Sequence, residues 1–237
     1  GRADLYCIKK NVSGKTEVHI LNAATGYSNF LLQIRTGLGE VGSDWEFGIS
    51  DYNSDKVPDV YCINKQGGSN TEAYVLDGGS YYQSFSLKIA TVMEPTDKNT
   101  QFLVAPDQFK LYAVKKLGVT NTEIHVIEGE ENKQNQNQTI EDLTNNQVEL
   151  GFNLDTALEL TDKNSVFAVG DFNKNTIPDI FVIKKSVAGR SEMHILNGAD
   201  KYKSFLLNVR LPIEATDENS EFRVADYNND GILDLYW

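Results

Sequence analysis

The sequence has few basic residues, few cysteines and no long apolar run. Lys and Arg number 22 against 34 Asp and Glu, for a formal net charge of −12. Such a chain lacks the basic face that nucleic acids and anionic membrane surfaces attract, whereas it could hold cations. No stretch approaches the roughly 18 apolar residues of a membrane-spanning helix, and no basic-then-apolar leader opens the chain. We therefore expect no nucleic-acid partner and no membrane insertion.

The chain also lacks the common signatures of catalysis. It contains no Ser/His/Asp series, no Gly-x-Ser-x-Gly motif and no phosphate-binding glycine loop. No segment shows a convincing helical period of apolar residues. These absences predict a protein that is not an enzyme and is built from strands.

What the chain does contain is an internal repeat. The motif "DLYCIKK" begins at residue 4, and related copies begin at residues 59, 110, 179 and 234, at intervals of 55, 51, 69 and 55. Three further motifs recur in the same order, beginning with "TEVHILN", "NFLLQIR" and "WEFGISDYN". The long interval carries an Asn/Gln-rich insert that is typical of a solvated loop. The repeats are approximately 4–58, 59–109, 110–178 and 179–233, with 234–237 starting or overlapping the next.

Each motif is a short run rich in Ile, Val, Leu, Tyr and Phe, bounded by Gly, Asn, Asp or Ser, which predicts a strand. Four short strands per repeat, at a period near 55 residues, are typical of β-propeller blades. The predicted fold is an all-β propeller of four-stranded antiparallel blades, forming one domain over 1–237. It is either a four-bladed ring or part of a larger propeller. A two-domain β-sandwich would not explain four copies of one four-strand unit.

The two cysteines, Cys7 and Cys62, occupy the same position in successive repeats. Equivalent positions in neighbouring blades lie too far apart for a disulfide, which needs Cα atoms within about 7 Å. Ala113 and Val182 fill this position in the other copies. We therefore expect both cysteines to be buried free thiols.

Three of the four repeats carry an acidic loop with the pattern Asp-x-Asn-x-Asp/Asn-x-x-x-Asp between two strands. Alternate side chains of a tight loop converge on one side, and oxygens from positions 1, 3, 5 and 9, with the carbonyl of position 7, suit Ca²⁺. A transition metal would favour His or Cys, which the loops lack, and the bidentate Glu of an EF-hand is missing. The predicted ligands are Asp51, Asn53, Asp55, Val57 and Asp59; Asp171, Asn173, Asn175, Ile177 and Asp179; and Asp226, Asn228, Asp230, Ile232 and Asp234.

The prediction is up to three calcium ions of unequal affinity. The loops at 51 and 226 offer three carboxylates each, whereas the loop at 171 offers two because Asn175 replaces Asp, and it should be the weakest. The equivalent segment at 105–110 keeps Asp107 but has Lys110 in place of the last Asp, so no calcium is expected there. Acidic loop residues could alternatively do no more than favour turns.

The segment "WEFGISDYNSDKVPDVYCINK" (45–65) resembles the FG-GAP/VCBS repeat family, and the resemblance extends over essentially the whole chain. The family includes the propeller heads of integrin α chains and fungal propeller lectins. The portion from "TEVHILN" to "GYSNFLLQIRTGLGE" is similar to repeats appended to secreted bacterial hydrolases. The resemblance implies calcium that braces a loop without doing chemistry. The degenerate second loop and the low number of repeats depart from the family, in which seven-bladed rings are usual.

Other repeated residues are interpreted as architecture. The histidines His19, His125 and His194 share one repeat position in separate blades, so they should not form a joint zinc site. The same holds for the repeated glutamates at Glu17, Glu72, Glu123 and Glu192, although paired carboxylates could serve glycoside hydrolysis.

Tyrosines precede the last strand of three blades. If exposed, Tyr27, Tyr81, Tyr82 and Tyr202 could contact a glycan, or they could only cap the blade edge. Asn11 and Asn137 match the N-glycosylation pattern and fall in predicted loops.

The two ends of the chain align with each other, because "GRADLYC" (1–7) matches "GILDLYW" (231–237). The strand "EFRVAD" (221–226) could complete the blade that the N-terminal strands begin, closing a four-bladed ring. Residues 4–7 and 234–237 would then compete for one strand position, and the loser could exchange with another chain. The competing interpretation is an excised piece of a longer propeller or array.

The sequence and the resemblance together predict a calcium-stabilised binding module that is secreted or displayed at the cell surface. Its expected partner is a glycan or a surface glycoprotein, so that the module would be lectin-like or adhesive. The alternative is a structural or targeting domain without catalysis, appended to a secreted hydrolase or surface protein.

Overall fold

The structure is a computed structural model that describes residues 3–105, 110–118, 120–129, 148–217, 219–228 and 230–237. The chain divides into two compact units. The first comprises Gly1–Lys98, Pro106–Leu111 and Ile127–Gly151, and the second comprises Asn99–Ala105, Tyr112–Val126 and Phe152–Trp237. No helix among the described residues is long and apolar enough to cross a membrane.

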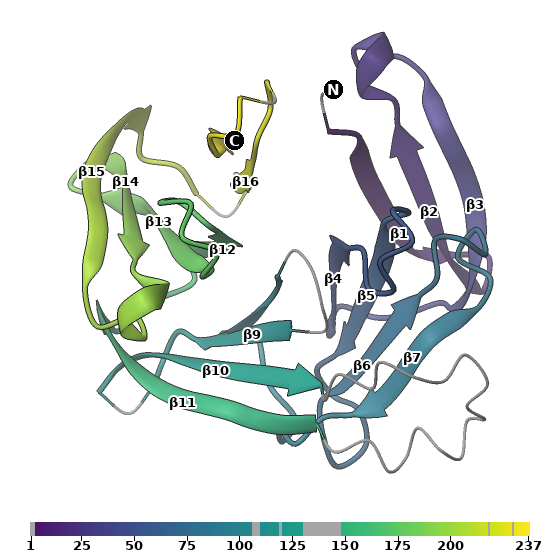
Figure 1. Ribbon diagram of the computed structural model, residues 1–237, viewed down its shortest axis with the longest axis horizontal. Coiled ribbons are helices and arrows are strands. Elements are labelled where there is room, and N and C mark those ends of the chain that lie inside the picture. Colours follow the sequence, from purple (N-terminus) through teal and green to yellow (C-terminus); the bar gives the residue numbers. More distant parts are fainter. Residues whose placement is uncertain (1–2, 106–109, 119, 130–147, 218, 229) are drawn as a thin grey trace. The chain divides into compact units, whose positions relative to one another are not determined.

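Every sheet is an antiparallel meander of neighbouring strands, which is the blade type of a β-propeller (Figure 1). The first sheet has three strands, β1 (Leu5–Val12), β2 (Lys15–Leu21) and β3 (Phe30–Gly39). Three sheets have four strands each: β4 (Trp45–Ser50), β5 (Asp59–Asn64), β6 (Glu72–Leu76) and β7 (Phe85–Ala90); β8 (Thr100–Val104), β9 (Lys110–Lys115), β10 (Asn121–Gly129) and β11 (Val148–Glu159); and β12 (Ser165–Gly170), β13 (Asp179–Val187), β14 (Arg190–Leu196) and β15 (Phe205–Glu214). The all-β fold of four-stranded blades is thus confirmed.

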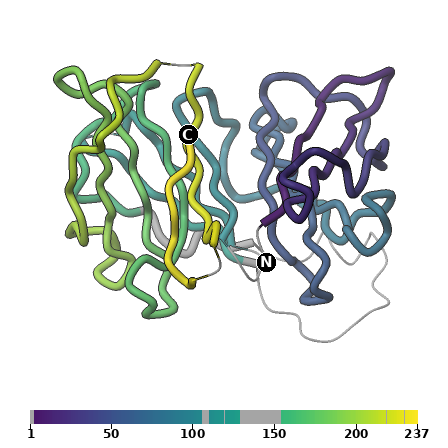
Figure 2. Tube along the Cα trace, turned by 90° about the horizontal axis from the view of Figure 1, so that it is seen from above, coloured from purple at the N-terminus to yellow at the C-terminus, as the bar shows by residue number. Residues whose placement is uncertain are grey.

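The C-terminal strands form a separate hairpin. Strand β16 (Arg223–Ala225) pairs with β17 (Asp234–Tyr236), and Figure 2 shows the two yellow strands running side by side. The sequence left residues 4–7 and 234–237 in competition for the position beside the strand at 221–226, and in the structure Asp234–Tyr236 pair with Arg223–Ala225. A short loop joins β16 to β17, so their local pairing costs little chain entropy.

The sheets are out of phase with the sequence repeats by one strand. Each four-stranded sheet opens with the last motif of one repeat and continues into the first motif of the next. Consequently the acidic loops are hairpin connections inside a sheet, at β4–β5, β12–β13 and β16–β17.

Both units have cores made by one sheet face packing on another. In the first unit, Val60, Cys62 and Leu76 pack with Val18 and Ile20 of the preceding sheet. In the second unit, one core joins the β8–β11 and β12–β15 sheets, and another joins the β12–β15 sheet to β16 and β17. Burial of β-branched and aromatic residues on both faces explains why these strands read as near-continuous apolar runs.

The two cysteines are free, as predicted, but they differ in exposure. Cys62 is buried and burial raises the pKa of its thiol, whereas Cys7 is exposed. Cys62 lies in β5 opposite Phe47 of β4. Cys7 lies in β1, which is an edge strand of its three-stranded sheet. The expectation of burial was therefore wrong for Cys7.

A lysine ends the first motif in each complete repeat, half-buried at Lys10 and buried at Lys65, Lys116 and Lys185. The ammonium of Lys10 donates to the carbonyl of Trp45 at 2.6 Å, and that of Lys116 donates to the carbonyl of Ser165 at 2.6 Å. Lys65 and Lys185 make the same kind of bond, to Asp97 and Ser220. Trp45, Ser165 and Ser220 lie at or just before the first strand of the following sheet. Lys10, Lys116 and Lys185 therefore tie successive sheets within their own units.

We expect Lys116→Met to destabilise the protein by about 2 kcal/mol, because it removes a charge-assisted hydrogen bond and leaves the Ser165 carbonyl without that donor. Urea denaturation measures the change. Lys115→Met is the matched control, since Lys115 is the neighbouring and less buried residue of β9, and it should cost under about 0.5 kcal/mol. Equal losses in the two variants would contradict the proposed role of Lys116.

Candidate metal-binding loops

Each acidic loop connects the two strands of one hairpin. The last paired residues are Ser50 and Asp59 in the first loop, Gly170 and Asp179 in the second, and Ala225 and Asp234 in the third. The ninth position of the pattern is therefore the first residue of a strand. Positions 1 to 8 form the loop itself.

In the first loop, side-chain oxygens turn inward to the loop's own amides. Asp51 accepts hydrogen bonds from the amides of Asp55 (3.2 Å) and Lys56 (2.8 Å). Asn53 also accepts from the Asp55 amide (3.0 Å), and Asp55 accepts from the amide of Val57 (2.7 Å). These are the local side-chain turns that Asp and Asn favour. As a result, positions 1, 3 and 5 all face the inside of the loop.

The other two loops repeat this geometry. Asp171 accepts from the amides of Asn175 and Thr176, and Asp226 accepts from those of Asp230 and Gly231, at distances from 2.7 to 3.1 Å. Position 6 has a left-handed backbone in all three, with φ of 70° at Lys56, 70° at Thr176 and 78° at Gly231. Only the third loop has a glycine at this position, and glycine adopts a left-handed backbone without strain.

The ninth-position aspartates Asp59 and Asp179 are fully buried and connect each loop to a distant turn. Asp59 accepts from the amide of Tyr52 inside the loop (2.8 Å) and from that of Gly78 after β6 (2.7 Å). Asp179 likewise accepts from Phe172 (3.0 Å) and Gly198 (2.8 Å). Burial raises the pKa of both carboxyls, and the backbone hydrogen bonds oppose this rise.

The donor set suits a hard cation in its chemistry. Carboxylate and amide oxygens are the ligands Ca²⁺ prefers, and an oxygen that accepts one N–H keeps a second lone pair. Within the described part of the chain, no three His, Cys, Asp or Glu side chains are grouped as for a metal. The oxygens instead hold backbone amides, so coordination would add to their present bonds. Metal binding at the fifteen predicted ligands stays a prediction.

One acidic residue beside the first loop was missed from the sequence. Asp77 follows β6 and accepts from the amide of Gly79 at 3.1 Å. A Cβ on Gly79 would lie 3.0 Å from Asp55 Oδ2 and 3.3 Å from Asp77 Oδ1, so both carboxylates border one small space. The equivalent of Asp77 in the β12–β15 sheet is Asn197. This difference in the second motif, "VLD" against "ILN", could have revealed it.

The structure describes only part of the degenerate loop at 105–110. Residues 106–109, including Asp107, lie outside the described residues. Lys110 opens β9 and forms an ion pair with Glu128 at 2.6 Å. A cation thus occupies the position of the ninth aspartate and is neutralised within its own sheet.

Two of the four tyrosines proposed for glycan contact are buried. Tyr82 is 2% exposed and donates to the Pro58 carbonyl at 3.0 Å, and Tyr202 is 5% exposed and donates to the Pro178 carbonyl at 3.1 Å. Burial raises the pKa of the Tyr82 hydroxyl, which keeps it a donor. The sequence left open whether these tyrosines are exposed or cap the blade edge, and the hydroxyls of these two brace the residue before the ninth aspartate. Tyr81 is 64% exposed.

Tyr27 is half-buried and makes the same kind of bond as these two buried tyrosines. Its hydroxyl donates to the carbonyl of Ala3 at 3.1 Å, and Ala3 directly precedes Asp4. The Asp4 carboxylate accepts from the amide of Ala23 at 2.8 Å. The start of β1 is therefore held in the same way as the starts of β5 and β13. An aspartate accepts a distant amide, and a tyrosine hydroxyl donates to the carbonyl before that aspartate.

The repeated histidines pair with the repeated glutamates two residues earlier. The distances are 2.9 Å for Glu17–His19, 3.2 Å for Glu123–His125 and 3.7 Å for Glu192–His194. In the remaining sheet, the Tyr74 hydroxyl donates to Glu72 at 2.8 Å. The hydrogen bond from His19 lowers the pKa of Glu17. Each pair lies within its own strand, which supports the architectural interpretation.

The two glycosylation candidates differ in what the structure shows. Asn11 is exposed, but it lies in β1 rather than in the predicted loop, one residue before the end of that strand. Asn137 lies outside the described residues. Glycosylation stays a prediction at both.

Comparison with protein-family models, with curated proteins and with solved structures finds no match for this chain. The resemblance to FG-GAP/VCBS repeats therefore rests on the motifs themselves. The blade-like sheets agree with it at the level of fold.

We expect Asp179→Ala to cost about 3 kcal/mol of unfolding free energy in EDTA, because two buried amides lose a charged acceptor. Asn173→Ala in the same loop is the control and should cost under about 1 kcal/mol, since Asn173 is exposed. Urea denaturation in EDTA separates this role from metal binding. A loss at Asp179 that appears only when calcium is present would contradict it.

Proposed function

We propose that the protein is a calcium-stabilised β-propeller module that binds carbohydrate outside the cell and does no catalysis. The observation that carries the proposal is the threefold recurrence of one loop geometry. Three hairpins with different sequences at their variable positions place Asp, Asn and Asp or Asn oxygens at the same inward sites. Selection for turns alone does not require the same three positions each time.

Calcium would brace these loops by linking oxygens that accept hydrogen bonds from amides of the same loop. Asp51, Asn53 and Asp55 would hold the ion in the first loop, and the Asp77 carboxylate would add negative charge nearby. The equivalent charge is missing beside the second loop, where Asn197 stands. The proposed order of affinity therefore places the first loop above the second.

Carbohydrate binding is supported by the surroundings of Tyr81. Its ring is exposed on the turn after β6, and its amide closes this turn by donating to the Gly78 carbonyl at 2.9 Å. The Gly78 amide joins the turn to the first acidic loop by donating to Asp59 at 2.7 Å. Gln83 braces the same turn by donating to the carbonyls of Arg35 (2.6 Å) and Tyr81 (3.2 Å). An exposed aromatic face beside carboxylates suits the apolar face and the hydroxyls of a sugar.

The second candidate function is a structural or targeting domain of a secreted hydrolase or surface protein. The burial of Tyr82 and Tyr202 favours it, since it removes two of the four aromatic contacts on which a lectin could draw. Secretion or display at the surface follows from the family resemblance in either case.

Addition of calcium to the EDTA-treated protein should raise the melting temperature, because a ligand that binds only the folded state stabilises it, by about 2.7 kcal/mol at a hundredfold excess over Kd. Differential scanning calorimetry measures the shift. Asp55→Ala and Asp230→Ala should each lose more of this calcium-dependent gain than Asn175→Ala. An unchanged melting temperature would eliminate the calcium proposal.

A glycan array probed in calcium should reveal sugar binding that falls about tenfold in Tyr81→Ala, as expected when an exposed aromatic contact of more than about 1 kcal/mol is removed. Lys201→Ala is the matched control, because Lys201 occupies the same left-handed turn position in the β12–β15 sheet. It should bind like the wild type. No binding to any glycan would favour the structural or targeting domain.

A further inference from the structure

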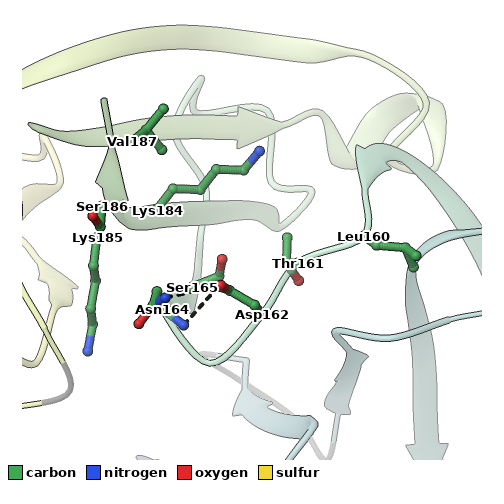
Figure 3. Close-up of a pocket in the computed structure, with 9 residues that line it drawn as sticks. All are labelled: Leu160, Thr161, Asp162, Asn164, Ser165, Lys184, Lys185, Ser186 and Val187. Atoms are coloured by element: carbon green, nitrogen blue, oxygen red, sulfur yellow. Dashed lines mark hydrogen bonds between the residues drawn. The ribbon is translucent and has the colours of Figure 1, made fainter. Parts of the chain in front are cut away.

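A small groove lies in the second unit between the loop after β11 and the end of β13 (Figure 3). Its volume is about 260 Å³, somewhat less than the roughly 300–1,000 Å³ of typical small-molecule sites. It therefore has room for one small ligand. The lining consists of Leu160, Thr161, Asp162, Asn164, Ser165, Lys184, Lys185, Ser186 and Val187.

The groove is open where the first unit has an indole. Ser165 of β12 pairs with Lys184 of β13, and at the same place in the first unit Trp45 of β4 pairs with Asn64 of β5. The Trp45 ring stacks on Tyr74, with centroids 5.5 Å apart and an interplanar angle of 23°. In the second unit the same position carries only the small side chain of Ser165, which lines the groove.

Lys184 supplies a cation to the groove. Its cross-strand neighbour Glu192 is engaged by Arg210, whose Nε lies 3.0 Å from a Glu192 oxygen. Among the described residues, no ion pair involves Lys184. The next residue, Lys185, points in a different direction (Figure 3) and donates to the carbonyl of Ser220. One of the two lysines therefore holds the fold, and the other is available to a ligand.

The rest of the lining offers acceptors, donors and apolar walls. Asp162 accepts from the Asn164 amide at 2.8 Å and from its side-chain nitrogen at 3.0 Å, which fixes the carboxylate in place. Leu160 and Val187 contribute aliphatic surface. A simple anion would meet Lys184 but also the charge of Asp162. A ligand with a carboxylate and several hydroxyls could meet both, because hydroxyls donate to Asp162 while the carboxylate binds Lys184.

We propose that this groove binds an acidic monosaccharide, such as a uronic acid, with its carboxylate on Lys184 and its hydroxyls on Asp162 and Asn164. The proposal rests on the proposed carbohydrate function and adds the class of sugar and a second contact site. Because Tyr81 lies in the other unit, the two sites can be tested separately.

The test is a ¹H–¹⁵N NMR titration of the full chain in calcium with glucuronate, with glucose and acetate as comparison ligands. Glucuronate should shift amides at Leu160–Ser165 and Lys184–Val187 with a Kd of about 1 mM, as expected for so small a ligand. Glucose and acetate should each bind at least about tenfold more weakly, because each offers only half of the interactions. Equal binding of acetate or of glucose would overturn the proposal.

Three variants sharpen the assignment. Lys184→Gln should weaken glucuronate binding at least about tenfold, because it removes the charged donor. Lys9→Gln is the matched control, since Lys9 occupies the same motif position in the first sheet opposite Glu17, and it should bind like the wild type. Ser165→Trp should fill the groove as Trp45 does in the first unit and abolish binding, with folding checked by its NMR spectrum.

Unchanged binding in Lys184→Gln would overturn the proposal even if Ser165→Trp failed to fold. If glucuronate shifts no groove amides while the array still shows sugar binding that depends on Tyr81, the groove proposal fails and the proposed function stands. If glucuronate shifts no groove amides and the array shows no sugar binding, both the groove proposal and the proposed function fail.

Discussion

In the β4–β7 and β12–β15 sheets, a buried aspartate at the start of the second strand is the interaction on which the rest of the sheet depends. A buried carboxylate is costly unless donors surround it. Asp59 and Asp179 each receive one amide from the hairpin loop before them and one from the turn after the third strand. The loop and the turn are thereby held at a defined separation. The tyrosine hydroxyls that donate to Pro58 and Pro178 strengthen the same joint.

The hydrogen bonds accepted by the ninth-position aspartate explain how the acidic loops keep one geometry despite different sequences. The ninth residue anchors the loop, and the first, third and fifth residues then fold around the loop's own amides. Residues such as Lys56 and Thr176 accept a left-handed backbone here, which costs of order 1 kcal/mol or more for a residue other than glycine. The bonds of the buried aspartate offset the strain of the loop, whose side-chain oxygens face inward onto its own amides.

Residues repeated in every blade serve packing, so the proposed carbohydrate recognition would draw on positions where the copies differ. The Glu–His pairs and the terminal lysines of the first motif are engaged inside the fold wherever they recur. Trp45 and Ser165 occupy one position, yet the first stacks on Tyr74 and the second lines a groove. Tyr81 and Lys201 likewise share a turn position but present different chemistry to solvent. The differences between copies are therefore better indicators of function than the shared motifs.

The sequence by itself determined the strands, their antiparallel order and the three loops, because apolar alternation and turn residues act over a few neighbours. It also placed Cys7 and Cys62 in equivalent positions, but their different exposure depends on whether a strand such as β4 lies alongside. The burial of Tyr82 and the groove at Ser165 were likewise decided only by tertiary structure. The physical reason is the same in each case: burial is set by neighbours from distant parts of the chain, which a local sequence pattern does not identify.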